Sequence, residues 1–184
     1  MASSRHDNDI ADNPFSVGTD PELSVQVRRE LLDTLHARTQ YDKATANEEL
    51  DARDVHEDFR LQFGELGLAT DNLPDLLAGH LLAMWCIVHG AALPDANVAQ
   101  GVSRQFAAQI ATSPMVGDPA RRQLMGEALL YEAVLSLEAW RLARDAGDKA
   151  KLKQMAESAQ SALLQQRGVN LRKTRLTAMG MMRA

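Results

Sequence analysis

The sequence has a single cysteine, few aromatic residues and almost no strand-like alternation of polar and apolar residues. With only Cys86, an internal disulfide is excluded, and its neighbours Trp85 and Ile87 predict a small buried hydrophobe and not a reactive thiol. Aromatic residues make up only 4% of the chain, which disfavours an aromatic-lined ligand site. The missing alternation excludes a sheet as the main structure.

The chain also lacks the features of export signals and membrane spans. Residues 1–17 contain no apolar run, and three aspartates stand where a signal peptide would carry positive charge. The longest uncharged stretch, 76–93, contains two histidines and two glycines, and no second stretch follows it. We therefore expect a cytoplasmic protein with no membrane span, in which 76–93 belongs to a buried helix.

Recognisable catalytic and metal-binding motifs are missing as well. There is no Glu-x-x-His pair, and no two of the five histidines have the i+3 or i+4 spacing that places two metal ligands on one helical face. Gly-rich phosphate loops and Gly-x-Ser-x-Gly elbows do not occur either. The sequence therefore predicts no metal, no cofactor and no catalytic residue, and it favours a protein that is not an enzyme.

What the chain does have is the composition of one helical domain. Its 184 residues are 45% hydrophobic and rich in Ala, Leu, Gln, Glu and Arg, which lose little entropy in a helix. Hydrophobic periodicity and capping residues predict about six helices, over 20–38, the later part of 39–63, 73–88, 95–112, 119–146 and 148–167.

One of these helices is expected at the centre of the fold. Apolar residues occur on every side of 73–88, which is typical of a helix surrounded by others. The longest helix is expected to bury Leu124, Ala128, Tyr131, Leu135 and Leu142. The fold class is therefore an all-α, single-domain bundle of about six helices around a central apolar helix.

Both ends of the chain are expected to lie outside this bundle. Residues 1–19 mix Ser, Asp, Asn, Pro and Gly without a period and indicate a disordered N-terminal arm. The helical domain covers 20–168. Residues 169–184 indicate a basic C-terminal tail, with Leu171 and Leu176 as possible anchors.

Charge is distributed unevenly along the chain, although its net value is only −5. Residues 1–75 hold 7 basic and 17 acidic residues, whereas 149–184 hold 8 basic and 1 acidic. Either the two ends attract each other within the chain, or the basic end meets a partner. The candidate interaction residues are Arg167, Arg172, Lys173 and Arg175. Because the tail has no aromatic residue to stack on bases, we expect no nucleic acid.

A second set of candidates is a group of polar and aromatic residues expected inside the bundle. Glu127 and Tyr131 lie one turn apart and could meet His80, and Trp85 and Trp140 could line a small apolar pocket. Such clusters can tune a general base, but more often each buried polar atom satisfies another. The candidate pocket residues are His80, Trp85, Glu127, Tyr131 and Trp140.

A set of short segments forms a recognisable pattern: 63–68, 71–73, Trp85 and 89–90 in the middle of the chain, 24–28 near the start, and 168–172, 175–177 and Gly180 near the end. This pattern resembles a family of uncharacterised bacterial proteins classed as a domain of unknown function. The resemblance implies an all-helical fold and carries no established activity. Family members usually have a signal peptide, so it also implies a periplasmic or secreted protein if such a signal has been removed.

Two hypotheses about function remain open from the sequence. The first is a non-enzymatic protein-interaction or binding module, whose partner is another protein or a second copy of the chain. The alternative is a small-molecule binder or enzyme that uses an internal pocket near His80, Trp85, Tyr131 and Trp140.

Overall fold

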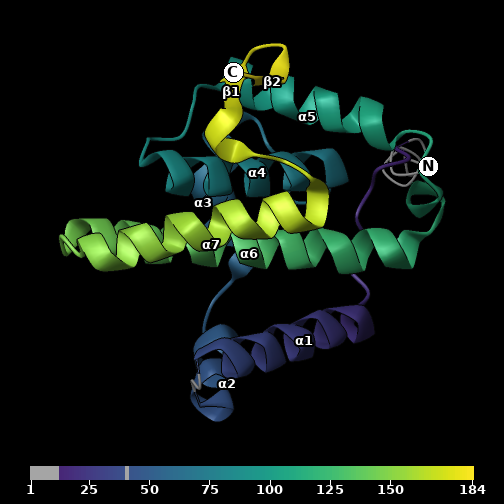
Figure 1. Cartoon of the computed structure of the whole chain (residues 1–184). Helices are drawn as coiled ribbons and strands as arrows, with labels where there is room; N and C mark the ends of the chain where they lie inside the picture. Colours follow the sequence, from purple (N-terminus) through teal and green to yellow (C-terminus); the bar gives the residue numbers. More distant parts are fainter. Residues whose placement is uncertain (1–12, 40–41) are drawn as a thin grey trace.

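The computed structural model describes residues 13–39 and 42–184 (Figure 1). Most of this part is helical, and the α-helices in chain order are α1 (Pro21–Thr39), α2 (Lys43–Asp51), α3 (Val55–Phe63), α4 (Leu73–His89), α5 (Ala96–Ile110), α6 (Pro119–Asp145) and α7 (Lys149–Arg167). Three short 3-10 helices accompany them, η2 (Gly64–Leu66), η3 (Pro114–Gly117) and η4 (Leu171–Lys173). A hairpin of β1 (Thr174–Thr177) and β2 (Gly180–Arg183) ends the chain. The expected all-α helical bundle is confirmed.

Aspartates at the helix starts explain why most of the helices were predictable. Side-chain oxygens accept hydrogen bonds from first-turn backbone N–H groups at the N-caps of five helices, Asp42, Asp54, Asp95, Asp118 and Asp148. Asp54 divides the segment expected to hold one helix into α2 and α3, so the described residues contain seven α-helices and not six. Gly90 and Gly168 end α4 and α7 in the left-handed conformation that glycine adopts without strain.

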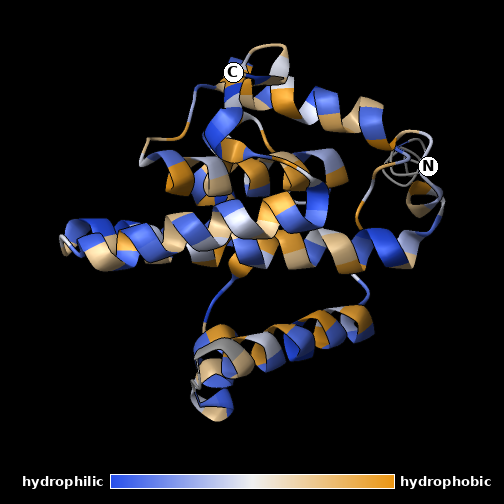
Figure 2. Ribbon diagram, in the orientation of Figure 1, coloured by the Kyte–Doolittle hydropathy of each residue, from blue (hydrophilic) through white to orange (hydrophobic). Residues whose placement is uncertain are grey.

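The helices form stacked layers around α4, as Figure 1 shows. Helix α4 packs against α5, α6 and α7, and most of its residues are buried. Hydrophobic colours run along α4, whereas much of α7 is hydrophilic (Figure 2). The central position predicted for 73–88 is confirmed. Helices α1 and α2 do not help to enclose it, because they lie on the other side of α6.

The buried face of α6 differs from the predicted one. Leu142 is 65% exposed and Ala128 is exposed, whereas Leu130, Val134 and Leu137 are almost completely buried. Because α4 packs on α6 more extensively than α1 does, the main apolar stripe is the one that faces α4. Periodicity alone did not show which of the possible stripes would face the central helix.

Both chain ends contribute to the folded structure more than the sequence indicated. Val17 belongs to the core with 6% exposure, and its backbone N–H donates to the Asp71 carbonyl at 2.8 Å. The expectation that all of 1–19 lies outside the core is therefore wrong for this residue, while 1–12 lie outside the described residues. At the other end, 169–184 form η4 and the hairpin instead of an extended tail. Leu171 is fully buried there, as its role of anchor predicts.

Candidate functional site

The C-terminal hairpin is a fixed part of the fold. In its antiparallel register Arg175 pairs with Met182 and Leu176 pairs with Met181. Because opposed residues share a face of the ladder, Leu176 and Met181 lie together on the face packed against the core. Arg175 and Met182 lie on the exposed face.

Hydrogen bonds from two helices hold this hairpin in place. The Trp85 indole Nε1–H on α4 donates to the carbonyl of Thr174 at 3.1 Å. On α5, the Gln105 amide donates to the Met181 carbonyl at 3.1 Å, and its Oε1 accepts from the Met181 N–H at 2.7 Å. The hairpin is thus bonded to both the central helix and α5.

Four cations on and beside this hairpin have no acidic partner. Their side chains are exposed, and none forms an ion pair within the described part of the chain; we call Arg172, Lys173, Arg175 and Arg183 the cationic hairpin. Lys173, Met182 and Arg183 also line a surface hollow of about 460 Å³, whose lining contains no Asp or Glu. This surface can accept an anionic group beside an apolar one.

The acidic N-terminal region does not neutralise the cationic hairpin. Helices α1 and α2 lie beyond α6, on the side of the molecule opposite the hairpin (Figure 1). Among the side chains that the structure describes, no ion pair joins residues 13–75 to residues 149–184. The interpretation that the two ends of the chain pack together through their charges is therefore wrong for these residues.

Arg167, the remaining basic candidate, belongs to a different place. It is the last residue of α7, and it interacts electrostatically with Glu132 of α6. Desolvation lowers the pKa of its guanidinium, and the Glu132 carboxylate opposes that shift. Arg167 therefore lies at the contact between α6 and α7 and is not part of the cationic hairpin.

The seam between α4, α6 and α7 contains one of the pocket candidates, His80. The His80 imidazole is 7% exposed, and its Nε2 lies 3.0 Å from the Glu132 carboxylate oxygen Oε2. Its Nδ1 is buried and has no hydrogen-bond partner. Beside this pair runs a cavity of about 270 Å³, which we call the seam cavity. The volume lies near the lower end of the range found for ligand pockets.

The other pocket candidates lie elsewhere, so the structure does not assemble the predicted pocket. Trp85 is engaged by the hairpin and stacks on His89, with ring centroids 4.5 Å apart. Trp140 lies under Arg144, whose guanidinium carbon is 5.0 Å from the ring centroid. The expectation that these indoles share one pocket with His80 and Tyr131 is wrong, because the side chains leave their helices in different directions.

Glu127 and Tyr131 face α1 and not the central helix. Glu127 is 5% exposed, and its Oε1 accepts hydrogen bonds from Ser24 Oγ at 2.7 Å and from Gln123 Nε2 at 2.8 Å. Burial raises the pKa of Tyr131, while the charge of Arg28 opposes the shift. The hydrogen bonds of Glu127 join α6 to Ser24 of α1, so the cluster docks α1 onto α6.

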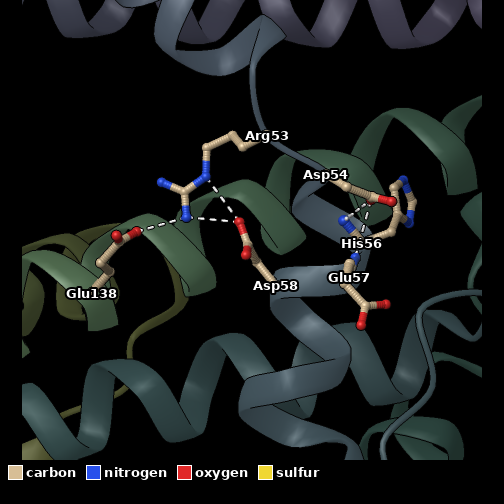
Figure 3. A network of polar contacts seen from close by, with 6 residues as sticks. All are labelled: Arg53, Asp54, His56, Glu57, Asp58 and Glu138. Carbon is tan, nitrogen blue, oxygen red and sulfur yellow. Dashed lines mark hydrogen bonds and ion pairs between the residues drawn. The ribbon is translucent and has the colours of Figure 1, made fainter.

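A second polar network, which the sequence did not indicate, ties the α2–α3 link to α6 (Figure 3). Arg53 donates from Nε and Nη2 to Asp58 at 2.9 and 2.7 Å, and its Nη2 lies 2.8 Å from Glu138 Oε2. Desolvation lowers the pKa of Arg53, but the bonds to Asp58 and Glu138 outweigh it and raise the pKa overall. The three residues are far enough apart in sequence that no local motif marks them.

The geometry gives little support to a metal site or a reactive thiol among the described residues. In the described part of the chain, no group of three His, Cys, Asp or Glu side chains is placed to hold a metal ion. Cys86 is fully buried, and desolvation raises the pKa of its thiol to about 12. No helix among the described residues is long and apolar enough to cross a membrane.

Comparison of the chain with models of known families, with curated proteins and with solved structures finds no match. The resemblance of its middle and C-terminal segments to a family of bacterial proteins therefore stays a prediction.

Proposed function

We propose that this protein is a non-enzymatic interaction module, and that its cationic hairpin binds an acidic segment of another protein. The observation that carries the proposal is the set of four exposed cations, on and beside a hairpin bonded to the core, that have no acidic partner among the described residues. Because the hairpin is held by α4 and α5, little conformational entropy is lost when a partner orders around it.

Charge segregation within the fold supports the same function. Helices α1 and α2, which carry part of the acidic charge of the N-terminal region, lie on the opposite side of α6. The cations therefore remain available to steer an anionic partner, an effect that weakens as salt screens the charges.

The chemistry of the hairpin favours a protein partner over nucleic acid. Met179 is 84% exposed and Met182 is 43% exposed, and flexible thioethers of this kind pack against varied apolar side chains. Trp85, the aromatic residue bonded to the hairpin, already has the His89 ring against it, and residues 169–184 contain no aromatic side chain on which a base could stack. An acidic segment with apolar residues between its carboxylates fits this surface best.

Fluorescence anisotropy with a labelled peptide of alternating Glu and Leu tests the proposal. The hairpin variant carries Arg172→Gln, Lys173→Gln, Arg175→Gln and Arg183→Gln. The matched control removes four exposed cations elsewhere, through Arg29→Gln, Arg60→Gln, Arg121→Gln and Lys149→Gln. Because both variants lose the same net charge, only a local site distinguishes them.

We expect the hairpin variant to bind the peptide at least tenfold more weakly, and the control less than twofold more weakly. Equal losses in both variants would overturn the proposal, because they would indicate unspecific attraction. Tighter binding of a DNA duplex than of the peptide would replace the protein partner with nucleic acid. If light scattering shows that only the hairpin variant loses self-association, the partner is a second copy of the chain.

A further inference from the structure

His80 occupies an unusual position for a histidine with a purely structural role. Its side chain is almost fully buried, yet Nδ1 has no hydrogen-bond partner. Buried polar atoms are nearly always paired, and an exception calls for an explanation. His80 also lines the seam cavity, so this residue stands beside the space that the three helices leave.

Small residues on α7 create that space. Ala159 and Ala162 face the cavity from α7, and larger side chains there would close it. The remaining apolar surface comes from Met84 and Ile87 of α4 and from Met155 and Leu163 of α7. These side chains form an apolar strip beside a polar lining that includes Ser136 and Ser158, and the flexible methionines suit an alkyl chain better than a rigid ring.

The two ends of the cavity differ in charge. Lys151 and Gln166 both line it and lie 15 residues apart on α7, a rise of about 22 Å. Near the Gln166 end, the Glu132 carboxylate already interacts with His80 and Arg167. Lys151 forms no ion pair with any described residue. The uncompensated charge of the cavity is therefore positive.

We propose that the seam cavity binds a medium-chain aliphatic carboxylate, with its head group at Lys151 and its chain along Met84 and Met155 toward the His80–Glu132 pair. The cavity residues of α4, from His80 to Ile87, span about 10 Å of helix rise, which matches a chain of about eight carbons. This site is separate from the cationic hairpin and does not depend on the function proposed for it.

Methyl NMR of the full chain with ¹³C-labelled methionine tests the proposal, with octanoate as the probe. Met84 and Met155 line the cavity, whereas Met179 and Met182 are exposed on the hairpin and serve as internal controls. We expect saturable shifts at the first pair and none at the second. Shifts of equal size at all four methionines would show unspecific adsorption and overturn the proposal.

The head group is tested with uncharged octanol and with octylamine. We expect octanoate to bind tightest, and Lys151→Gln to weaken octanoate about fivefold while leaving octanol unchanged. Lys149→Gln is the matched control, because Lys149 lies on the same helix but does not line the cavity. Tighter binding of octylamine than of octanoate, or equal effects of the two lysine variants, would overturn the assignment.

Chain length and blockage test the apolar part of the site. From butanoate to octanoate, each added methylene should raise the affinity about three- to fourfold, and the gain should stop when the chain reaches His80. Ala162→Leu should abolish octanoate binding by filling the cavity. If Ala162→Leu fails to fold, the chain-length series decides alone, and an affinity independent of length contradicts the proposal.

Discussion

Gly101 of α5 lies directly against the backbone of Ala178 in the hairpin turn. A β-carbon at Gly101 would come within 2.6 Å of the Ala178 carbonyl carbon, closer than real contacts allow. Because a backbone cannot rotate aside like a side chain, the absence of a side chain at Gly101 is what lets the cationic hairpin sit on α5.

We therefore expect Gly101→Ala to push the turn away and to lower the free energy of unfolding by about 1–3 kcal/mol. Urea unfolding measures the loss, and amide exchange of 174–183 locates it. Gly64→Ala is the control, because Gly64 has a helical backbone and no atom near its missing β-carbon, so that change should be neutral or stabilising. Unchanged exchange in the hairpin of Gly101→Ala would contradict the contact.

Gln123 is the centre of the contact between α1 and α6. It is 2% exposed, its Oε1 accepts from the Asp20 N–H at 2.9 Å, and its Nε2 donates to the Asp20 carbonyl at 2.7 Å and to Glu127. Gln123→Met keeps the length of the side chain but leaves these groups without partners. We expect a loss of about 1–3 kcal/mol in the free energy of unfolding. Gln109→Met, at an exposed position of α5, should cost less than about 0.5 kcal/mol.

Native-state hydrogen exchange should separate the layers of the fold. Helix α4 is enclosed by α5, α6 and α7, so its amides should exchange only through global unfolding. The α1–α2 pair buries few apolar residues, chiefly Val27, Ala46 and Leu50, and should open at a lower free energy. Exchange of residues 73–88 as fast as that of α1 would contradict the central position of α4.

Local sequence signals were sufficient to predict most of the helices, although they did not separate α2 from α3. An aspartate cap needs only the next turn of backbone, as at Asp95 and Asp118, and the apolar residues of 73–88 identify a central helix whichever helices surround it. These features depend on neighbours within a few residues, which a single sequence displays.

The position of the hairpin and the arrangement of the candidate site depend on contacts between residues that are far apart in the sequence. A single sequence does not show such contacts. The strands are four residues each, too short for a clear alternation, and Trp85, Gly101 and Gln105 hold them from far along the chain. The pocket was predicted wrongly for a related reason. Predicting it requires knowing how each helix is rotated about its own axis, which a single sequence does not show. His80 and Glu127 both proved to be buried, but they face different neighbours.

Cys86 should be unreactive in the native state and should couple stability to alkaline pH. Desolvation raises the pKa of the thiol from 9.0 to about 12, so the unfolded chain ionises first as the pH rises. The contribution of the Cys86 thiol to the free energy of unfolding is fully present below pH 9 and is lost as the pH approaches 12. Relative to Cys86→Ala, the native protein should therefore lose stability across that window, as urea unfolding at several pH values would show. Rapid labelling of the native thiol at pH 8 would contradict its burial.

An ordinary core substitution lowers the free energy of unfolding, but the unpaired nitrogen of His80 predicts that replacing this residue does not. His80→Leu removes the buried Nδ1 atom, whose missing partner costs about 1–3 kcal/mol, while it keeps a side chain of similar size. Glu132 loses one hydrogen bond but is 59% exposed, so water can replace it. We expect His80→Leu to leave the free energy of unfolding unchanged or to raise it.

His89→Leu provides the comparison for this last substitution. His89 Nε2 lies 3.0 Å from the Leu171 carbonyl, and its ring stacks on Trp85, so its removal should cost about 1 kcal/mol. Urea unfolding of both variants at one pH measures the contrast. A loss above about 2 kcal/mol for His80→Leu would show that the imidazole supports the fold. A gain would mean that the chain keeps a destabilising histidine beside its seam cavity, as proteins do where a residue serves binding at the expense of stability.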